Sequence, residues 1–458
     1  MHFYRSGEDD VKDGLTRRTL LSGLALGAVP LRARGSEAPP APAARRLFAQ
    51  PDLDFLASFA LGATSYGSAE AGEVLAAIDR INAAGAAYQT YFDEFIALAR
   101  RLSAEGDAAL RAGHKETARA ASLRAAHYYK QALFVVFGTS TPGDGARVYG
   151  AMQAQWHRAA GLFDPPFERV EIPYEGTTLP AYFLKPDRSQ RRRPTVILNN
   201  GSDAQNIDLW AYGGATALAR GYNALIFEGP GQGAMYFERH VVFRPDWEKV
   251  ITPVVDALVA RPDVDPKRIA ITGWSMGGGL VLRAAAFEHR LAAVVADPGI
   301  DESWASFPEI LHRVAGAGDS DAVNRIWRTQ IINDLKPVER FTIMNKISIF
   351  SRKFEEAARA GRVGDDFYDA AKAIQQFRFA DALDRVTAPL LITSYENEHT
   401  NPPGTAEKVF ARAKEPKKMI RFLAADGAGD HDAPLAPQRR NNAIFDWLDE
   451  TLRPPKTR

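Results

Sequence analysis

The stretch from Arg268 to Gly279 constrains the fold more than any other part of the chain. Residues Ile269–Ile271 are typical of a short buried strand, and Leu280–Phe287 is rich in the alanine and leucine of a helix. Between them a Gly-x-Ser-x-Gly motif places Ser275 on a tight turn. The flanking glycines lack side chains, which lets strand and helix approach closely. The motif therefore predicts a serine that points out of the fold as a nucleophile; the alternative is an ordinary surface serine.

Strands and helices alternate on both sides of this motif, after a hairpin over residues 167–184. Strands are predicted at 195–199, 223–227, 292–296, 389–393 and 419–423, and helices at 217–220, 246–260 and 441–452. This alternation predicts an α/β fold with a mostly parallel, doubly wound sheet and helices on both faces. Ligands in such sheets bind at the carboxyl ends of the strands, so we expect the functional site there.

Two other segments lack the alternation and are predicted to be helical. We divide the chain into a signal and linker (1–45), an N-terminal helical cap domain (46–165), the first part of an α/β core (166–300), a helical lid insertion (301–381) and the second part of the core (382–458). The predicted helices of the two helical segments are Val74–Ile81, Tyr88–Leu102, Ala104–Ala112, Lys115–Val136, Ser303–Ala315, Ala322–Leu335, Ser348–Ala360 and Asp366–Phe377.

The N-terminus resembles a twin-arginine export signal. Arg17 and Arg18 precede a weakly apolar run, Leu20–Val29, which is shorter than the roughly 20 residues that span a bilayer. We therefore expect no membrane span, and export by the twin-arginine route to the periplasm or the medium, with cleavage after Ala33 or Ala43. The alternative is a disordered basic tail.

Composition excludes several classes of function. The formal net charge is +1, which argues against nucleic acid as the main partner. The chain has no cysteine, so disulfides, thiolate catalysis and cysteine metal sites are excluded. His399 lies beside Glu398, but a single neighbouring His–Glu pair is not a metal site. We expect neither a metal nor a cofactor.

Two loops after late strands carry the residues that would complete a catalytic triad with Ser275. His431 lies after the last strand and before the last helix, where the base belongs. The loop after residues 389–393 contains Glu396 and Glu398, and spacing favours Glu398 as the acid. Glu396 and Asp297 remain alternative acids. The two aspartates that flank the base, at positions 430 and 432, are interpreted as tuning its field or capping a turn.

Two further loops belong to the same edge of the predicted sheet. The backbone N–H of Met276 would be one oxyanion donor, and the N–H of Ser202, or of a neighbour in the loop 199–203, the second; the alternative for this loop is a plain glycine turn. The loop Glu228–Gly233 lacks the Lys and Ser/Thr of a phosphate-binding loop. We interpret it as a rigid loop at the rim of the site.

Several motifs together resemble a known family. They are Phe167-Glu-Arg-Val-Glu-Ile-Pro-Tyr-Glu-Gly, Glu228-Gly-Pro-Gly-Gln-Gly, Arg244-Pro-Asp-Trp-Glu and Gly273-Trp-Ser-Met-Gly-Gly. With the order Ser, acid, His, they resemble the α/β-hydrolase superfamily over about residues 167–452. Behind a helical N-terminal domain they resemble the subgroup of 2,6-dihydroxypseudooxynicotine hydrolase, the fungal polyketide chain-shortening hydrolases and the fermentation-respiration-switch-type esterases.

The resemblance implies a serine hydrolase acting on a small-molecule acyl substrate, and a homodimer. Relatives often carry Asp as the acid, whereas this chain offers Glu398. The favoured activity is hydrolysis of a carboxylic ester or related acyl compound. The alternative, which the resemblance to 2,6-dihydroxypseudooxynicotine hydrolase and the fungal chain-shortening hydrolases implies, is hydrolysis of a carbon–carbon bond in a 1,3-dicarbonyl. Weaker alternatives are a peptidase, which would need a preceding β-propeller, and a non-catalytic binding protein on a hydrolase fold.

Overall fold

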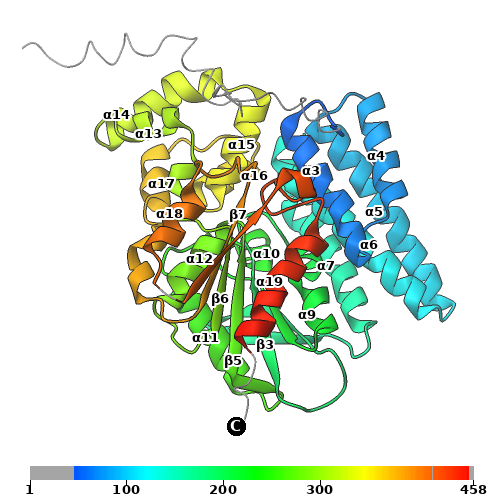
Figure 1. The fold of residues 1–458 in the computed structure, drawn as a ribbon. Helices are drawn as coiled ribbons and strands as arrows, with labels where there is room; N and C mark the ends of the chain where they lie inside the picture. Colours follow the sequence, from blue (N-terminus) through cyan, green and yellow to red (C-terminus); the bar gives the residue numbers. More distant parts are fainter. Residues whose placement is uncertain (1–45, 415, 453–458) are drawn as a thin grey trace, which may run out of the picture.

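An eight-stranded sheet lies at the centre of the computed structural model, which describes residues 46–414 and 416–452. Figure 1 shows N-terminal helices packed along one side of this sheet, a helical insertion above its upper end and the last helix running across it. The α/β-hydrolase architecture expected from the sequence, with an N-terminal helical region, is confirmed. The five-part division of the chain stays a prediction.

The sheet is mostly parallel. Its strands are β1 (Glu168–Tyr174), β2 (Thr177–Leu184), β3 (Arg193–Asn199), β4 (Asn223–Phe227), β5 (Val264–Trp274), β6 (Ala293–Asp297), β7 (Leu390–Tyr395) and β8 (Lys417–Phe422). They lie in the order β1-β2-β4-β3-β5-β6-β7-β8. Only the pairs β1–β2 and β2–β4 are antiparallel. The carboxyl ends of β3 to β8 therefore meet at one edge.

The central strands are buried along their whole length because both faces are covered. All five residues of β4 and all five of β6 are buried, as expected for parallel strands between two helical layers. The helices that connect and cover the strands are α8 (Asn206–Leu209), α9 (Ala215–Ala219), α10 (Gly233–Phe237), α11 (Glu248–Val259), α12 (Met276–Ala285), α18 (Thr405–Arg412) and α19 (Pro437–Thr451).

The N-terminal helices differ from the prediction in three places. They are α3 (Pro51–Gly62), α4 (Ala71–Ala83), α5 (Tyr88–Arg111), α6 (Lys115–Phe134) and α7 (Gly145–Gly161). The two helices predicted over 88–112 are one helix, α5, and the hydroxyl of Ser103, the residue between the two predicted segments, bonds the carbonyl of Ala99 at 2.8 Å. Helices α3 and α7 were not predicted, although Pro51 occupies a favoured first-turn position in α3.

The insertion between β6 and β7 contains one helix that the sequence analysis missed. Its helices are α13 (Glu309–Ala315), α14 (Ser320–Ile326), α15 (Pro337–Ser348), α16 (Arg352–Arg359) and α17 (Phe367–Ile374), joined by short helical turns. Helix α15 was missed, yet it carries the start signals of a helix. Pro337 opens it, and the Glu339 carboxylate accepts the backbone N–H of Lys336 at 2.8 Å.

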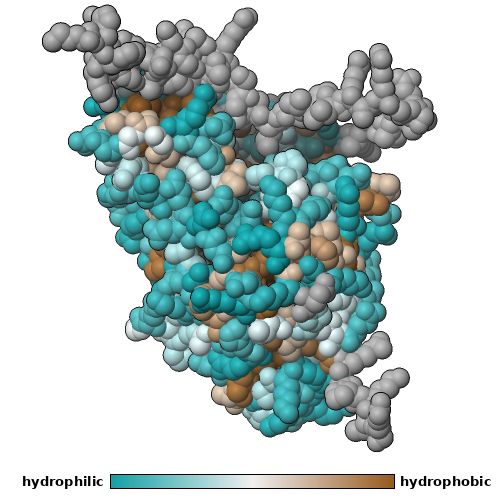
Figure 2. All heavy atoms as spheres, turned by 60° about the vertical axis from the view of Figure 1, so that its left-hand side comes forward, coloured by the Kyte–Doolittle hydropathy of each residue, from teal (hydrophilic) through white to brown (hydrophobic). Residues whose placement is uncertain are grey.

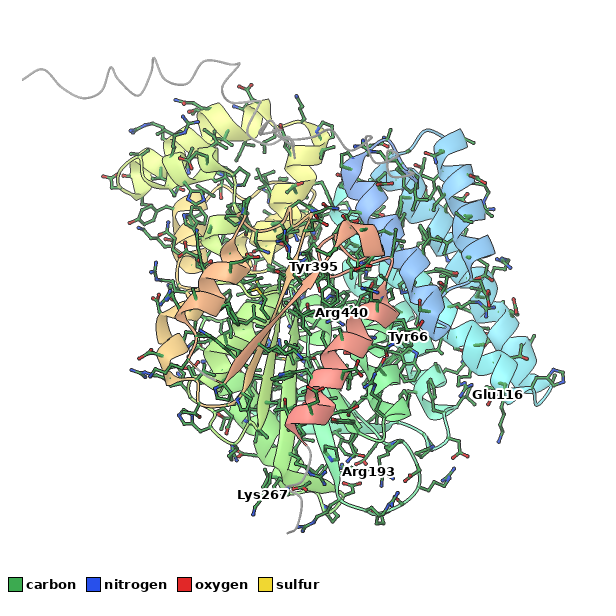
Figure 3. The ribbon with its side chains drawn as sticks, viewed as in Figure 1. Tyr66, Glu116, Arg193, Lys267, Tyr395 and Arg440 are labelled. Carbon is green, nitrogen blue, oxygen red and sulfur yellow. The ribbon has the colours of Figure 1, made fainter. Side chains whose placement is uncertain are left out.

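The two ends of the sheet lie in different parts of the molecule. Figure 3 shows Tyr395 and Arg440 together near the middle of the molecule, whereas Arg193 and Lys267 lie at the far, lower end of the sheet.

The face in Figure 2 is mostly hydrophilic, with hydrophobic colour in separate patches. No helix within the described residues is long and apolar enough to cross a membrane. The predicted export signal lies outside the described residues.

Candidate active site

Ser275 occupies a strained turn between β5 and α12. Its φ of 57° and ψ of −127° are unusual for a residue with a side chain. A Cβ on Gly273 would lie 2.0 Å from the carbonyl oxygen of Gly277, so glycine is needed for the close approach. The helix begins directly at Met276, four residues before the predicted start. The strained turn thus holds the serine at the positive end of a helix.

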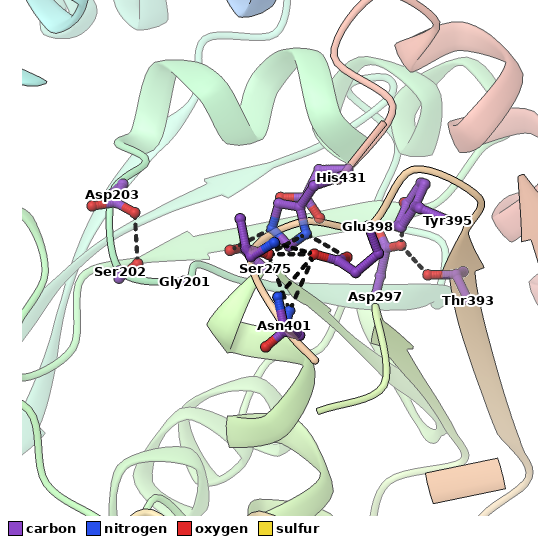
Figure 4. Close-up of polar contacts among 12 residues, drawn as sticks. Gly201, Ser202, Asp203, Ser275, Asp297, Thr393, Tyr395, Glu398, Asn401 and His431 are labelled. Carbon is purple, nitrogen blue, oxygen red and sulfur yellow. Dashed lines mark hydrogen bonds and ion pairs between the residues drawn. The ribbon is translucent and has the colours of Figure 1, made fainter. Parts of the chain in front are cut away.

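A chain of hydrogen-bond distances joins three of the predicted site residues. Ser275 Oγ lies 3.0 Å from His431 Nε2, and His431 Nδ1 lies 2.7 Å from Glu398 Oε2. Figure 4 shows the imidazole between the serine and the carboxylate, although the three residues come from separate loops after β5, β7 and β8. The arrangement has the geometry of a nucleophile, a base and an acid that orients the base.

The loop after β7 fixes the Glu398 carboxylate. Its Oε1 accepts the backbone N–H groups of Thr400 at 2.8 Å and of Asn401 at 3.2 Å, which leaves Oε2 for His431. Burial works against ionisation, but the charge and hydrogen bond of His431 and the bonds from Thr400 hold the pKa of Glu398 well below its usual range. Glu398 is therefore ionised at neutral pH.

A second carboxylate contacts the same imidazole. Asp432 Oδ2 lies 3.2 Å from His431 Nε2, the nitrogen that also faces Ser275. Burial of the His431 ring opposes its charged form, but Asp432 and Glu398 together raise the pKa of His431 well above its usual value. Burial raises the pKa of Asp432 in turn. Asp432, which we had interpreted as tuning the field of the base, is in direct contact with it.

The two alternative acids do not contact His431. Asp297 is fully buried and binds Thr393, Tyr395 and Arg440, as Figure 4 shows in part. Glu396 accepts the backbone N–H of Ala424 at 2.7 Å. Asp297 is engaged because β6 ends beneath the C-terminal helix, whose arginine needs a buried counter-charge.

The loop after β3 lies against the serine turn. A Cβ on Gly201 would lie 3.0 Å from Ser275 Cβ and 2.5 Å from the carbonyl oxygen of Trp274. Glycine at this position therefore lets the loop lie directly against the serine turn. The Gly201 N–H donates to Asn200 Oδ1 at 2.8 Å. In the part of the chain that the structure describes, the N–H groups of Ser202 and Met276 have no acceptor. Both predicted oxyanion donors are thus available, while the Ser202 hydroxyl donates to a neighbouring aspartate.

The predicted rigid loop after β4 supports this arrangement. The Gln232 side chain donates to the carbonyl oxygens of Asn200 at 2.8 Å and Gly201 at 3.2 Å. The buried Glu228 carboxylate accepts the hydroxyl of Tyr149 at 2.8 Å, which ties the loop to α7. Burial raises the pKa of Glu228 to about 7. The loop therefore holds the backbone that carries the second donor.

Two aromatic residues that the sequence analysis missed come from α3. The Phe55 ring lies 4.9 Å from the His399 ring and 6.4 Å from the His431 ring, between centroids. Phe59 lies 5.8 Å from the Trp274 ring. Their four-residue spacing puts both on one helix face, but nothing in the local sequence shows that this face covers the serine. Within residues 46–414 and 416–452, no cluster of three or more His, Asp or Glu side chains suits a metal.

Comparison with known proteins decides the family. The model of the alpha/beta hydrolase family matches residues 205–443, more than half of the chain. The chain belongs to the alpha/beta hydrolase family. The hydrolase LUC6 of Fusarium sp is 34% identical to it over 414 residues, which cover 86% of this chain and 94% of that protein. Alpha/beta hydrolase ucsC of Acremonium sp is 33% identical over 260 residues, 53% of this chain. The chain spans about half the length of that relative, at 52%.

Among solved structures, this alpha/beta hydrolase is similar to 2,6-dihydroxy-pseudo-oxynicotine hydrolase. The match has a TM-score of 0.63 and 22% identity and covers 85% of this chain and 95% of that one. The match covers a larger part of this chain than the segment from β1 to the C-terminus makes up. It therefore includes residues of the N-terminal helical region as well as the sheet. The resemblance to this subgroup, inferred from the sequence, is confirmed at the level of the fold.

Proposed function

We propose that this alpha/beta hydrolase is a serine hydrolase that cleaves a carboxylic ester or related acyl bond. One observation carries the proposal: Ser275 Oγ, both nitrogens of His431 and Glu398 Oε2 form a continuous chain with distances of 3.0 and 2.7 Å. Proximity of nucleophile, base and orienting acid is the recurring arrangement of such enzymes. We propose these three residues as the triad.

The reaction would proceed in two halves. Ser275 Oγ attacks the acyl carbonyl while His431 Nε2 takes its proton, and Glu398 stabilises the charged imidazole through Nδ1. The N–H groups of Met276 and Ser202 would bind the developing oxyanion. His431 then gives its proton to the departing alcohol. Water, deprotonated by the same imidazole, releases the acid and restores the serine.

The sequence resemblance supports a second candidate, cleavage of a carbon–carbon bond in a 1,3-dicarbonyl. The same serine and oxyanion donors would serve, because the acyl half of the reaction is unchanged. The two differ in the leaving group, which is an alkoxide from an ester and an enolate from a diketone.

An assay of both substrate types with one preparation tests the proposal. Wild-type protein should hydrolyse 4-nitrophenyl butyrate, and Ser275→Ala should lower that activity by about 10⁴-fold or more. Turnover of pentane-2,4-dione without ester turnover would favour the second candidate. Equal activities of wild type and Ser275→Ala would overturn both.

Two expectations from the sequence remain proposals of ours. We infer that the chain is exported by the twin-arginine route, for which the motif at Arg17 and Arg18 is the support. Replacing both arginines by lysine should keep the protein in the cytoplasmic fraction, and unchanged distribution would contradict export. We also infer a homodimer, which light scattering tests directly; a monomeric mass would contradict it.

A further inference from the structure

A cavity beside the proposed active site contains a buried lysine that the mechanism does not use. The cavity lies between helix α6, the loop after β3 and the end of α15. Its lining includes Lys130, Ser202 and Asn345, and most other lining residues are apolar or aromatic. Ser202 follows Gly201, which lies against Ser275. The cavity therefore begins where the proposed oxyanion donor lies and extends towards the N-terminal helices.

Within the described residues, the Lys130 ammonium has at least one N–H group in this cavity without a hydrogen-bond acceptor. Only 4% of the residue is exposed, yet its nearest acidic partner, Asp208 Oδ1, is 3.5 Å from Nζ. The ammonium also lies over the rings of Phe59 at 5.7 Å and Phe134 at 6.0 Å. An ammonium has three N–H donors. In the described chain, Lys130 Nζ has this one long ion pair and no shorter hydrogen bond, so at least one N–H is left for a ligand in the cavity.

The neighbouring charges are already engaged with other groups. Asp203 forms an ion pair with Lys346 of α15 at 2.5 Å and accepts the Ser202 hydroxyl. Asp208 accepts the Gln205 backbone N–H at 2.8 Å, and burial raises its pKa. Burial also lowers the pKa of His127, the other titratable neighbour of Asp208, so that ring stays neutral. Lys346 has a close carboxylate partner, and the His127 ring is neutral. Among these described residues, Lys130 is thus the cation that lies in apolar surroundings with only the long ion pair to Asp208.

We propose that Lys130 is a substrate-binding residue that donates a hydrogen bond to an anionic oxygen on the acyl group, remote from the carbonyl that Ser275 attacks. The inference rests on the proposed function, because it takes the cavity beside Ser202 as the acyl site. The oxygen is supplied by a carboxylate or an ionised enol, whereas a plain hydrocarbon chain would strand the buried ammonium. The cavity volume is about 30 Å³, so neighbouring side chains must shift when an acyl chain enters.

The test compares three six-carbon acyl chains on one leaving group. The 4-nitrophenyl esters of hexanoate, 3,5-dioxohexanoate and monoadipate end in a methyl group, an ionisable 1,3-diketone and a carboxylate. Lys130→Met should lower kcat/KM for the monoadipate ester by about 10–100-fold and leave the hexanoate value within about threefold. An effect on the dioxo ester that grows with pH would assign the oxygen to an enolate; an effect on monoadipate alone would assign it to a carboxylate.

Two further variants separate binding from structural damage. Lys130→Met with Asp208→Asn removes the carboxylate that the single variant strands, and it should show the same loss of discrimination. Lys115→Met, at the exposed start of the same helix, should behave like wild type on all three esters. Asp208→Asn alone frees the ammonium further and should increase the preference for monoadipate.

Failure of this inference is distinguishable from failure of the proposed function. If the proposed function fails, wild type hydrolyses none of the esters, and the direct binding of adipate, measured by calorimetry on wild type and the double variant, still tests the lysine. Tighter binding by wild type supports the subsite. Equal losses on all three esters, or equal adipate affinities, would overturn it and leave Lys130 as a structural ion-pair partner of Asp208.

Discussion

Two carboxylates lie at the ends of neighbouring strands, Asp297 at the end of β6 and Glu398 beyond β7, and each binds a nitrogen base from the C-terminal part of the chain. Asp297 pairs with Arg440, and both residues are at least 98% buried, with exposures of 0% and 2%. Glu398 pairs with His431. An arginine does not release its proton in a protein, whereas a histidine does.

The bonding partner, and not the number of hydrogen bonds, separates the two carboxylates. Both carboxylates are well satisfied by hydrogen bonds, so satisfaction does not distinguish them. The partner distinguishes them: Asp297–Arg440 is a fixed charge pair, and Glu398–His431 is a pair whose proton can move. Only the second also reaches a nucleophile, through the 3.0 Å contact between His431 and Ser275.

The largest expected effect is on catalysis. Glu398→Gln should lower kcat by about 10³–10⁴-fold without unfolding the protein, because a neutral amide no longer holds the imidazole in the correct tautomer. Steady-state hydrolysis of 4-nitrophenyl butyrate, with folding checked by circular dichroism, measures this. Glu396→Gln in the same loop should stay within about threefold of wild type. Comparable losses in both variants would remove the special role of Glu398.

The matching change at the other carboxylate should act on stability. Asp297→Asn leaves the Arg440 guanidinium buried without its counter-charge and should lower the free energy of unfolding by about 3–5 kcal/mol. Urea unfolding followed by tryptophan fluorescence measures it. Combining the change with Arg440→Met should restore part of the loss. A stable Asp297→Asn protein with activity as low as that of Glu398→Gln would reverse the two roles.

The smallest expected effect is a shift in pH dependence. Asp432 raises the pKa of His431, together with Glu398, while burial of the ring opposes them and the neighbouring His399 ring packs nearby. Asp432→Asn removes a negative charge and therefore lowers the pKa of His431. The base form then persists to lower pH, so the acidic limb of kcat/KM should move towards lower pH. Asp430→Asn, whose carboxylate bonds Asn397 instead, is the control.

The profile for Asp432→Asn has a clear contrary outcome. If the acidic limb stays in place, or moves to higher pH, the contact between Asp432 and His431 Nε2 does not govern protonation of the base. A uniform drop in kcat/KM at every pH would instead place Asp432 among the residues that only hold the geometry of the loop.

Much of this architecture can be predicted from local sequence patterns. The serine turn was predictable because glycines, a buried strand and a helix occur together around Ser275, and the loops of Glu398 and His431 follow strands in an order that few folds share. Helix α15 was missed although its start signals are local. Its Pro337 and Glu339 are a capping pattern that outweighs the β-branched residues behind them.

The rest depends on contacts between distant residues, which no local pattern encodes. The covering of the site by Phe55 of α3, the pairing of Asp297 with Arg440, and the placement of Lys130 opposite Asp208 each join separate elements of the fold. The sequence named Asp297 as a rival acid because it lies at the correct edge of the sheet. Only the packing of α19 against that edge shows that its carboxylate is already engaged.

We propose above all that Ser275 is an activated nucleophile with His431 as its base. Labelling of the purified protein with a fluorophosphonate probe, followed by peptide mapping, tests it most directly, beside Ser275→Ala and His431→Ala. We expect label on the peptide of Ser275 in the wild type and none in either variant. Label that persists in His431→Ala at the wild-type rate, or that falls on another serine, would contradict it.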